Sequence, residues 1–369
     1  MTRNPLRTTL CDKLGIEYPI VAFTHCRDVA AAVINAGAFA VVGETHHSPD
    51  EIAADVKWLR EHIGDKPFGI DLLFPVSVPA MGSVEQLLAQ VPTAQREFTE
   101  DIKRRHKIPH PKRMPEIFSY GWMNMETPRK QLDTVLDLKV PVLASGLGTP
   151  AFVPEAAHAR GMQVWSMIGK PRQAKKQLEA GVDAIIAQGF DAGGHTGPIG
   201  TFSIVPQVAA MAGDTPVLAA GGITTGRHLA GAITLGAAGV WTGTVWLTSH
   251  ESDREMVLKE ILLAATQEDT CYSTCVSGFT MRTLRTKWHE EWESPKAPKP
   301  APPPYQMLLF AEVKQSAMDW NIPSFMTEAA GQGVGFMNAM KPARQIVFDM
   351  VDEALTVFED LFGAPLGQE

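Results

Sequence analysis

The feature that most constrains this chain is a repeated alternation of short β-branched apolar runs with longer amphipathic ones. The short runs occupy residues 19–24, 39–43, 68–74, 140–145, 163–168, 183–188, 216–221 and 239–243. Helical patterns fill most of the intervals, and several end in glycine, which readily closes a helix. This alternation predicts βα units and a parallel sheet. Eight units favour a (β/α)8 TIM barrel, although counting alone leaves a doubly wound sheet open.

Two segments interrupt the alternation. The first is an insertion at about residues 75–126, directly after the strand at 68–74. Because the loops after barrel strands form the catalytic face, we expect the insertion to cover the site or shape substrate access. The second begins near residue 250 and contains a proline-rich connector at 293–305, expected to be extended and exposed, followed by two helical patterns. We therefore predict a barrel over residues 1–250 and a C-terminal helical subdomain over 251–369, packed on the barrel.

The composition of the chain limits the classes of partner and the cellular location that we expect for it. The formal net charge of −8 argues against nucleic acid, which requires a concentrated basic surface. No apolar run reaches the roughly 18 residues of a membrane span, and the N-terminus lacks an apolar signal region, so we expect a cytoplasmic protein. Four cysteines are too few for a disulfide framework, and Cys271 and Cys275 lack a second ligand pair for a metal. A homo-oligomer is compatible with the sequence.

Residues that follow the strands of a barrel line one common mouth, where catalysis takes place. The chain places glycine, histidine and hydroxyl side chains at many of these positions. The mouth residues predicted in this way are Thr24, His25, His46, His47, Asp71 late in the strand at 68–74, Ser145, residues 188–196, Gly221, Gly222, Gly243 and Thr244.

The last four of these positions predict a phosphate site. Gly221 and Gly222 follow the strand at 216–221, and Gly243 and Thr244 end the next one. Barrels commonly bind phosphate at these two turns through backbone N–H groups and a following helix N-terminus. The alternative is that the glycines only make tight turns.

The segment "QGFDAGGHTG" at 188–197 combines flexibility with a titratable ring. Gln188 can offer both a donor and an acceptor to the edge of a heteroaromatic ring. Gly193 and Gly194 would let the main chain lie flat against a planar cofactor, with His195 on the open side. A lone histidine is more often structural, but the glycines remove the usual packing motive, and an imidazole can take a proton near neutral pH.

The segments "AQGFDAGGHTG", "PVLAAGGI", "GVWTGTVWL", "AAAVINAGAFAVVG" and "EAAGQGVGFM" resemble the nitronate monooxygenases, FMN-dependent barrels formerly called 2-nitropropane dioxygenases. The resemblance spans most of the chain. It implies that FMN is bound with its phosphate at the last two turns. It also implies that His195 is the catalytic histidine, acting as acid or base near substrate and flavin. The flavin-binding residues implied by the resemblance are Gln188, Gly193, Gly222, Trp241, Thr242, Gly243 and Thr244.

The chain departs from this family at the other side of the mouth. Where the family usually has a Pro-Met pair after the first strand, this chain has Thr24 and His25. Where the family commonly has asparagine in the third strand, this chain has Asp71, which should lower the flavin's reduction potential or be protonated. We therefore take Thr24, His25, His46 and Ser145 as candidates for the substrate side.

Two flavin-dependent functions remain. The leading one is oxidation of an alkyl nitronate with O2 to a carbonyl compound and nitrite. The alternative is reduction of a quinone or enoyl thioester with NAD(P)H as electron donor, since the chemistry of a site rather than its fold sets the reaction. A metal-dependent lyase or hydrolase using His25, His46, His47, His195 and Asp71 is a third reading, but we predict no metal because His46 and His47 cannot easily both point inward.

Overall fold

The structure is a computed structural model that describes residues 4–74, 84–115, 126–146 and 148–362. Within these residues, parallel strands close into a barrel in the order β1-β2-β3-β4-β5-β6-β8-β9. The predicted (β/α)8 barrel is therefore confirmed, and each predicted strand boundary lies within two residues of the observed one. The barrel strands are β1 Ile20–Thr24, β2 Phe39–Gly43, β3 Gly69–Leu73, β4 Val142–Gly146, β5 Gln163–Ile168, β6 Ala184–Gln188, β8 Val217–Ala220 and β9 Gly239–Thr242.

Alternate residues of each strand fill the barrel. The inward-facing side chains form a continuous apolar core that includes Val21, Phe39, Trp165, Leu218 and Trp241. The outward-facing side chains form a second apolar layer beneath the surrounding helices. Burial on both faces explains why the strands are near-continuous apolar runs in the sequence.

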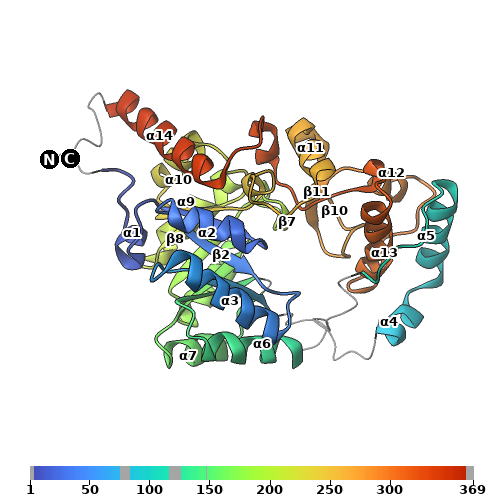
Figure 1. Ribbon diagram of the computed structural model, residues 1–369, viewed down its shortest axis with the longest axis horizontal. Coiled ribbons are helices and arrows are strands. Elements are labelled where there is room, and N and C mark those ends of the chain that lie inside the picture. Colours follow the sequence, from blue (N-terminus) through green and yellow to red (C-terminus); the bar gives the residue numbers. More distant parts are fainter. Residues whose placement is uncertain (1–3, 75–83, 116–125, 147, 363–369) are drawn as a thin grey trace.

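Helices surround the barrel, and the C-terminal helix completes the ring by packing on α2 and α10 (Figure 1). The sequence starts α3 with a capping box, in which Ser48 Oγ accepts a hydrogen bond from the Glu51 N–H and Glu51 Oε2 accepts one from the Ser48 N–H. The helices next to the barrel are α1 Thr9–Leu14, α2 Arg27–Asn35, α3 Pro49–Ile63, α6 Glu126–Asp137, α7 Phe152–His158, α8 Pro171–Glu179, α9 Thr201–Ala212, α10 Gly226–Thr234 and α14 Ala343–Phe362.

A second lobe lies beside the barrel, on the right of Figure 1. Its apolar core joins Ile102 of the insertion with Leu258, Trp288 and Val313 of the later segment. Ion pairs cross the same junction, including Arg105 with Glu291 at 2.6 Å. Its elements are α4 Val84–Gln90, α5 Thr93–Arg105, β10 Thr270–Ser273, β11 Met281–Leu284, α11 Met256–Ala264, α12 Lys287–Trp292, α13 Tyr305–Asp319 and the 3-10 turns η3 Gln267–Asp269 and η4 Pro323–Phe325.

The second lobe differs from a purely helical extension in two ways. Strands β10 and β11 form a small sheet with β7 Gly194–His195, a two-residue strand that follows β6. The proline-rich segment is not exposed throughout, because Ala301 is 1% exposed. The predicted boundary at residue 250 stays a prediction, and the insertion shares its core with the later segment.

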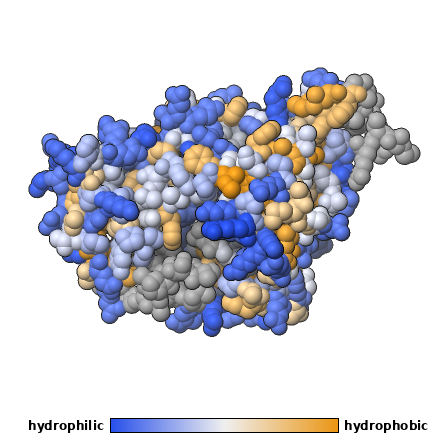
Figure 2. All heavy atoms as spheres, turned by 180° about the vertical axis from the view of Figure 1, so that it is seen from behind, coloured by the Kyte–Doolittle hydropathy of each residue, from blue (hydrophilic) through white to orange (hydrophobic). Residues whose placement is uncertain are grey.

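The face of the molecule in Figure 2 is largely hydrophilic, with apolar side chains gathered toward the end of α14. Leu361 and Phe362 there are 68% and 70% exposed. Among the described residues, none of the helices has both the length and the apolar character needed to cross a membrane.

Candidate active site

The C-terminal ends of the barrel strands bring predicted site residues to one mouth. Asp71 of β3 is in register with Ala144 of β4. Across the barrel, Gln188 of β6 is in register with Ala220 of β8, which pairs with Trp241 of β9. Because Ala144, Ala220 and Trp241 belong to the interior core, the register places Asp71 and Gln188 on the inward face at the mouth.

Asp71 is a buried acid at this mouth. Asp71 is only 6% exposed, and its carboxyl group makes no hydrogen bond within the part of the chain that the structure describes. Burial raises the pKa of Asp71 well above that of an ordinary carboxyl group. A neutral acid can donate a hydrogen bond, which a carboxylate cannot. Of the two alternatives that the sequence leaves for Asp71, the structure favours the protonated one.

His195 is held in β7 by antiparallel pairing with Met281 of β11. Its Nε2 lies 2.9 Å from the Oγ of Ser277, and its ring packs edge-on against Phe279 with centroids 5.9 Å apart. Burial lowers the pKa of His195 to about 4. The imidazole is therefore neutral at pH 7, with one nitrogen free to accept a proton.

The loop that leads to His195 is fixed by the second lobe. Arg282 donates a hydrogen bond from Nε to the carbonyl of Phe190 at 3.2 Å, and its guanidinium lies 4.5 Å from the centre of the Phe190 ring. The hydroxyl of Tyr272 donates to the carbonyl of Thr196 at 3.2 Å. Contacts from residues far along the chain therefore hold a segment that its glycines would leave flexible.

The two glycines before His195 have different surroundings. Gly194 has a φ of +78°, and a Cβ added there would meet nothing within 4 Å. A Cβ on Gly193 would lie 2.8 Å from the backbone between Ala330 and Gly331. Gly193 therefore serves a close approach between two backbone segments, whereas Gly194 has the open space that a flat ligand would need.

The turns after β8 and β9 offer backbone donors. Gly221 and Gly222 have φ values of +104° and +71°, which favour glycine. The N–H groups of Gly222 and Thr244 donate to no acceptor among the described residues, whereas the Thr244 hydroxyl accepts from the Gly331 N–H at 2.9 Å. Thr244 begins the 3-10 turn η2 Thr244–Trp246, and Gly331 precedes η5 Gln332–Phe336. Two such free donors at neighbouring turns suit an anion such as phosphate.

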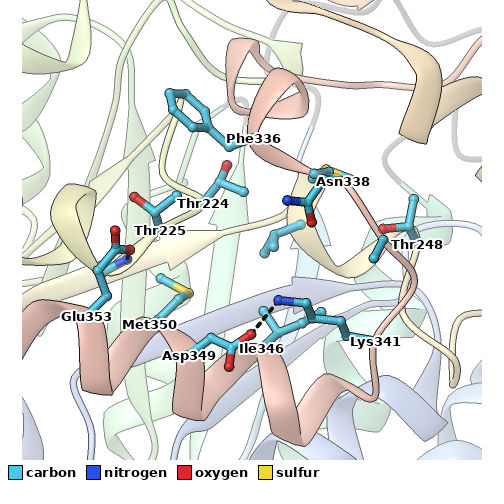
Figure 3. A pocket seen from close by; sticks show the side chains of 14 residues that line it. Thr224, Thr225, Thr248, Phe336, Asn338, Lys341, Ile346, Asp349, Met350 and Glu353 are labelled. Atoms are coloured by element: carbon cyan, nitrogen blue, oxygen red, sulfur yellow. Dashed lines mark hydrogen bonds and ion pairs between the residues drawn. The ribbon is translucent and has the colours of Figure 1, made fainter.

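The N-terminus of α10, which the sequence includes in the phosphate site, is already occupied. The carboxylate of Glu353 accepts a hydrogen bond from the Gly226 N–H at 2.7 Å. A pocket of about 170 Å³ lies on this side, where Lys341 pairs with Asp349 at 2.6 Å (Figure 3). Two carboxylates, Asp349 and Glu353, make this pocket unfavourable for phosphate, so the turn N–H groups are the better candidates for binding an anion.

On the β1 side, the hydroxyl of Thr24 accepts the Cys26 N–H at 3.0 Å. His25 directs Nδ1 at the carbonyl of Gly43 at 2.8 Å, so Nδ1 carries the proton there. Desolvation by the surrounding protein lowers the pKa of His25, although part of its surface is open to solvent. Burial is the main cause that lowers the pKa of His46 to about 4, with smaller contributions from the neighbouring His25, Lys314 and His47, although its surface is open to solvent. Both rings are therefore neutral at pH 7.

Three further predicted site residues, Ser145, Thr242 and Trp241, make hydrogen bonds or ring contacts with other residues of the protein. The hydroxyl of Ser145 donates to the carbonyl of Gly148 at 2.8 Å. Thr242 donates to a β1 carbonyl at 3.2 Å and is 1% exposed. Trp241 stacks on Phe23 with ring centroids 5.5 Å apart. These residues form the wall of the mouth. Gly243 lies beside open space, because a Cβ added there would meet no atom within 4 Å.

The histidines and Asp71 proposed for a metal site do not come together in the described residues. The single group with metal-ligand spacing there is Glu44, His47 and Asp55, whose ligand atoms lie within 4.8 Å of one another. His47 Nδ1 is 2.5 Å from Glu44 Oε2 and 3.2 Å from Asp55 Oδ2, while Arg27 binds Asp55 at 2.7 Å. Hydrogen bonding to Glu44 raises the pKa of His47 to about 9. The group is therefore an ion-pair network in which Arg27 and His47 supply the positive charge.

The fold and mouth define a class of parallel-barrel enzymes with backbone donors that lack acceptors among the described residues at the last two turns, and a histidine after the sixth barrel strand. The sequence model described as nitronate monooxygenase matches residues 7–353. The chain therefore belongs to the nitronate monooxygenase family and is an oxidoreductase of that type. The resemblance seen in the sequence is confirmed.

Several known proteins are similar to this chain along almost its whole length. The Mycobacterium tuberculosis protein named "Putative monooxygenase Rv1533" is 38% identical over 97% of this chain and 99% of its own. The nitroalkane oxidase of Streptomyces ansochromogenes is similar in structure, with a TM-score of 0.78 and 26% identity over 95% of this chain and 99% of its own. FabK of Thermotoga maritima is also similar in structure, with a TM-score of 0.74 and 27% identity over 97% of this chain and 99% of its own.

The residues of the second lobe that reach the site were not predicted from the sequence. Ser277, Phe279 and Arg282 contact the His195 segment from more than 80 positions away. The runs "TCYS" and "MRTL" on either side of a turn carried a hairpin signal. Nothing local in those runs indicated that His195 would be their third strand.

Proposed function

We propose that this protein binds FMN at the barrel mouth and oxidises alkyl nitronates with O2 to a carbonyl compound and nitrite. The observation that carries the proposal is a neutral, half-buried His195 held in the same mouth as the free turn donors. The nitroalkane oxidase likeness supports the substrate class.

The described residues fit FMN. The N–H groups of Gly222 and Thr244 would bind its phosphate, and Gln188 would address the edge of its ring system. The neutral acid of Asp71 would give a hydrogen-bond donor from the opposite wall. Bound FMN would accept electrons from the substrate and pass them to O2.

The role of His195 follows from its charge state. With a pKa of about 4, its ring enters the reaction neutral. A nitronate carries negative charge, and a nearby anion favours the imidazolium form. Binding of the substrate therefore raises the pKa of His195, which can then take up a proton and balance the charge of the electron-rich carbon.

Reduction by NAD(P)H is a second candidate, because the likeness to FabK is almost as close as that to the nitroalkane oxidase. In that reaction a quinone or enoyl thioester would be the acceptor, and the histidine would have to supply a proton. A pKa of about 4 opposes this role at neutral pH, since the ring then holds little of the imidazolium form.

The test is steady-state oxidation by the FMN-loaded protein. We expect propyl-2-nitronate to give nitrite and consume O2, with NADPH adding nothing to either rate. Rapid NADPH oxidation in the presence of a quinone, with no nitrite from any alkyl nitronate, would overturn the proposal in favour of the reductase.

A further inference from the structure

Ser277 is a buried hydroxyl that the reaction described above does not use. It lies in the turn between β10 and β11 and is 2% exposed. Its Oγ is 2.9 Å from His195 Nε2 and 3.2 Å from the carbonyl oxygen of Phe279. One hydroxyl therefore links the imidazole to a backbone acceptor.

The hydrogen-bond inventory of these three groups determines which nitrogen of His195 carries the proton. The Phe279 carbonyl can only accept, so the Ser277 hydroxyl donates to it. The same hydroxyl has no second proton and can offer His195 only a lone pair. Since the neutral ring has a single N–H, both bonds form together only when that N–H is at Nε2. The other tautomer would leave the Phe279 carbonyl without this donor.

We propose that Ser277 is a positioning residue that fixes His195 as the Nε2–H tautomer and so makes Nδ1 the proton-accepting atom. The tautomer is independent of the substrate, whereas the use of Nδ1 in catalysis rests on the proposed function. Burial alone accounts for the low proton affinity of the ring, with no charged group of the described residues contributing, so the neutral form persists across the neutral range.

The surroundings of Ser277 hold the hydroxyl in place. The next residue, Gly278, has a φ of +82°, and a Cβ on it would lie 2.5 Å from the nitrogen of Pro303 and 2.8 Å from the carbonyl oxygen of Ala301. The proline-rich segment therefore packs directly against this turn. On the other side, pairing of Met281 with His195 fixes the strand that carries the donating imidazole. The two segments clamp the turn so that the Ser277 hydroxyl stays within reach of the ring.

The first experiment reads the tautomer directly. Histidine-labelled, FMN-loaded protein is examined by long-range ¹H–¹⁵N NMR, with the signal of His195 assigned by its loss in His195→Gln. We expect wild type to carry the proton on Nε2, Ser277→Thr to keep it there, and Ser277→Ala to show a mixture or the Nδ1–H form. Ser316→Ala is the matched control, because Ser316 is a fully buried serine of the same lobe with a hydroxyl that has no partner among the described residues. An Nδ1–H ring in wild type, or an unchanged tautomer in Ser277→Ala, would overturn the inference; the wild-type spectrum decides even where Ser277→Ala does not fold.

The second experiment links the tautomer to the reaction. For Ser277→Ala we expect kcat for nitronate oxidation to fall about tenfold, the loss of roughly one hydrogen bond, with KM and FMN affinity unchanged. Ser277→Thr should restore the rate, and Ser316→Ala should not alter it. A full rate in Ser277→Ala despite an altered tautomer would contradict the use of Nδ1. If wild type has the Nε2–H tautomer but oxidises no nitronate, the proposed function fails while the tautomer assignment stands.

Discussion

The two sides of the barrel mouth are built in different ways. On the β6 side, His195 and its loop are fixed by Met281, Arg282 and Ser277, which come from the second lobe. On the β1–β3 side, Asp71 and His25 are set by the barrel's own strands, and their pKa shifts come mainly from burial. The position of the His195 imidazole thus depends on residues far along the chain, whereas the opposite wall depends on the local fold of the barrel. Changes on the two sides should therefore have separable effects.

The largest effect is expected from removing the imidazole on the β6 side. His195→Gln should lower kcat/KM for nitronate oxidation by about 10²-fold or more, the usual contribution of a positioned acid or base. FMN content should be unchanged, because the predicted flavin contacts lie on other residues. His25→Gln on the β1 side is the matched comparison, and we expect it to lower the rate less than tenfold. Equal losses from both changes in a nitronate assay would remove the distinction between the two sides.

The next effect concerns the turn donors beside the β6 wall. Gly222→Ala places a Cβ 3.1 Å from that of Asp191 at a φ of +71°, which should cost about 1–2 kcal/mol and weaken FMN binding roughly tenfold. Gly231→Ala in α10 is the control, because its Cβ would meet nothing within 4 Å and alanine favours helix. Titration of the apoprotein with FMN, followed by flavin fluorescence, measures the FMN affinity of both variants. Unchanged affinity in Gly222→Ala would show that the phosphate does not use this turn.

A smaller effect is expected from replacing the acid on the opposite wall. Asp71→Asn keeps a neutral donor, so turnover and flavin reduction potential should change little at pH 7. Because burial raises the folded-state pKa of Asp71 above its unfolded value, wild type loses stability as the pH rises through the folded-state pKa. As the pH rises through the folded-state pKa of Asp71, the Tm of Asp71→Asn should therefore fall less than the Tm of wild type. A large rise in the reduction potential of Asp71→Asn at pH 7 would instead mean that the wild-type group is ionised.

The smallest effect is expected at the ion pair behind the β2 loop. The pKa of His47 is raised from 6.5 to about 9, so its contribution is full below pH 6.5 and declines until the pH has passed 9. His47→Gln should therefore lower the free energy of unfolding at pH 6 by about 1 kcal/mol, a value discounted for the partial exposure of the ring. Denaturant titrations at pH 6 and pH 9.5 check this result. A difference between wild type and variant that does not shrink at the higher pH would contradict the pairing.

The barrel was predictable because each strand and helix is specified within a short window of sequence. The alternation of apolar runs placed β3 and β6, and their C-terminal parts bring Asp71 and Gln188 to one mouth. The rest depends on contacts between distant segments. The occupation of the α10 N-terminus by Glu353 and the pairing of β7 with β11 leave no local signal in the sequence. For the same reason, Gly193 could not be recognised as a packing position against Ala330.

The most direct test of the central claim is an anaerobic mixing experiment that follows the absorbance of protein-bound FMN. The account predicts that propyl-2-nitronate bleaches the flavin band rapidly in wild type and much more slowly in His195→Gln, while NADH and NADPH leave the band unchanged. Rapid bleaching by either nicotinamide nucleotide, with a band that persists in the presence of the nitronate, would contradict it.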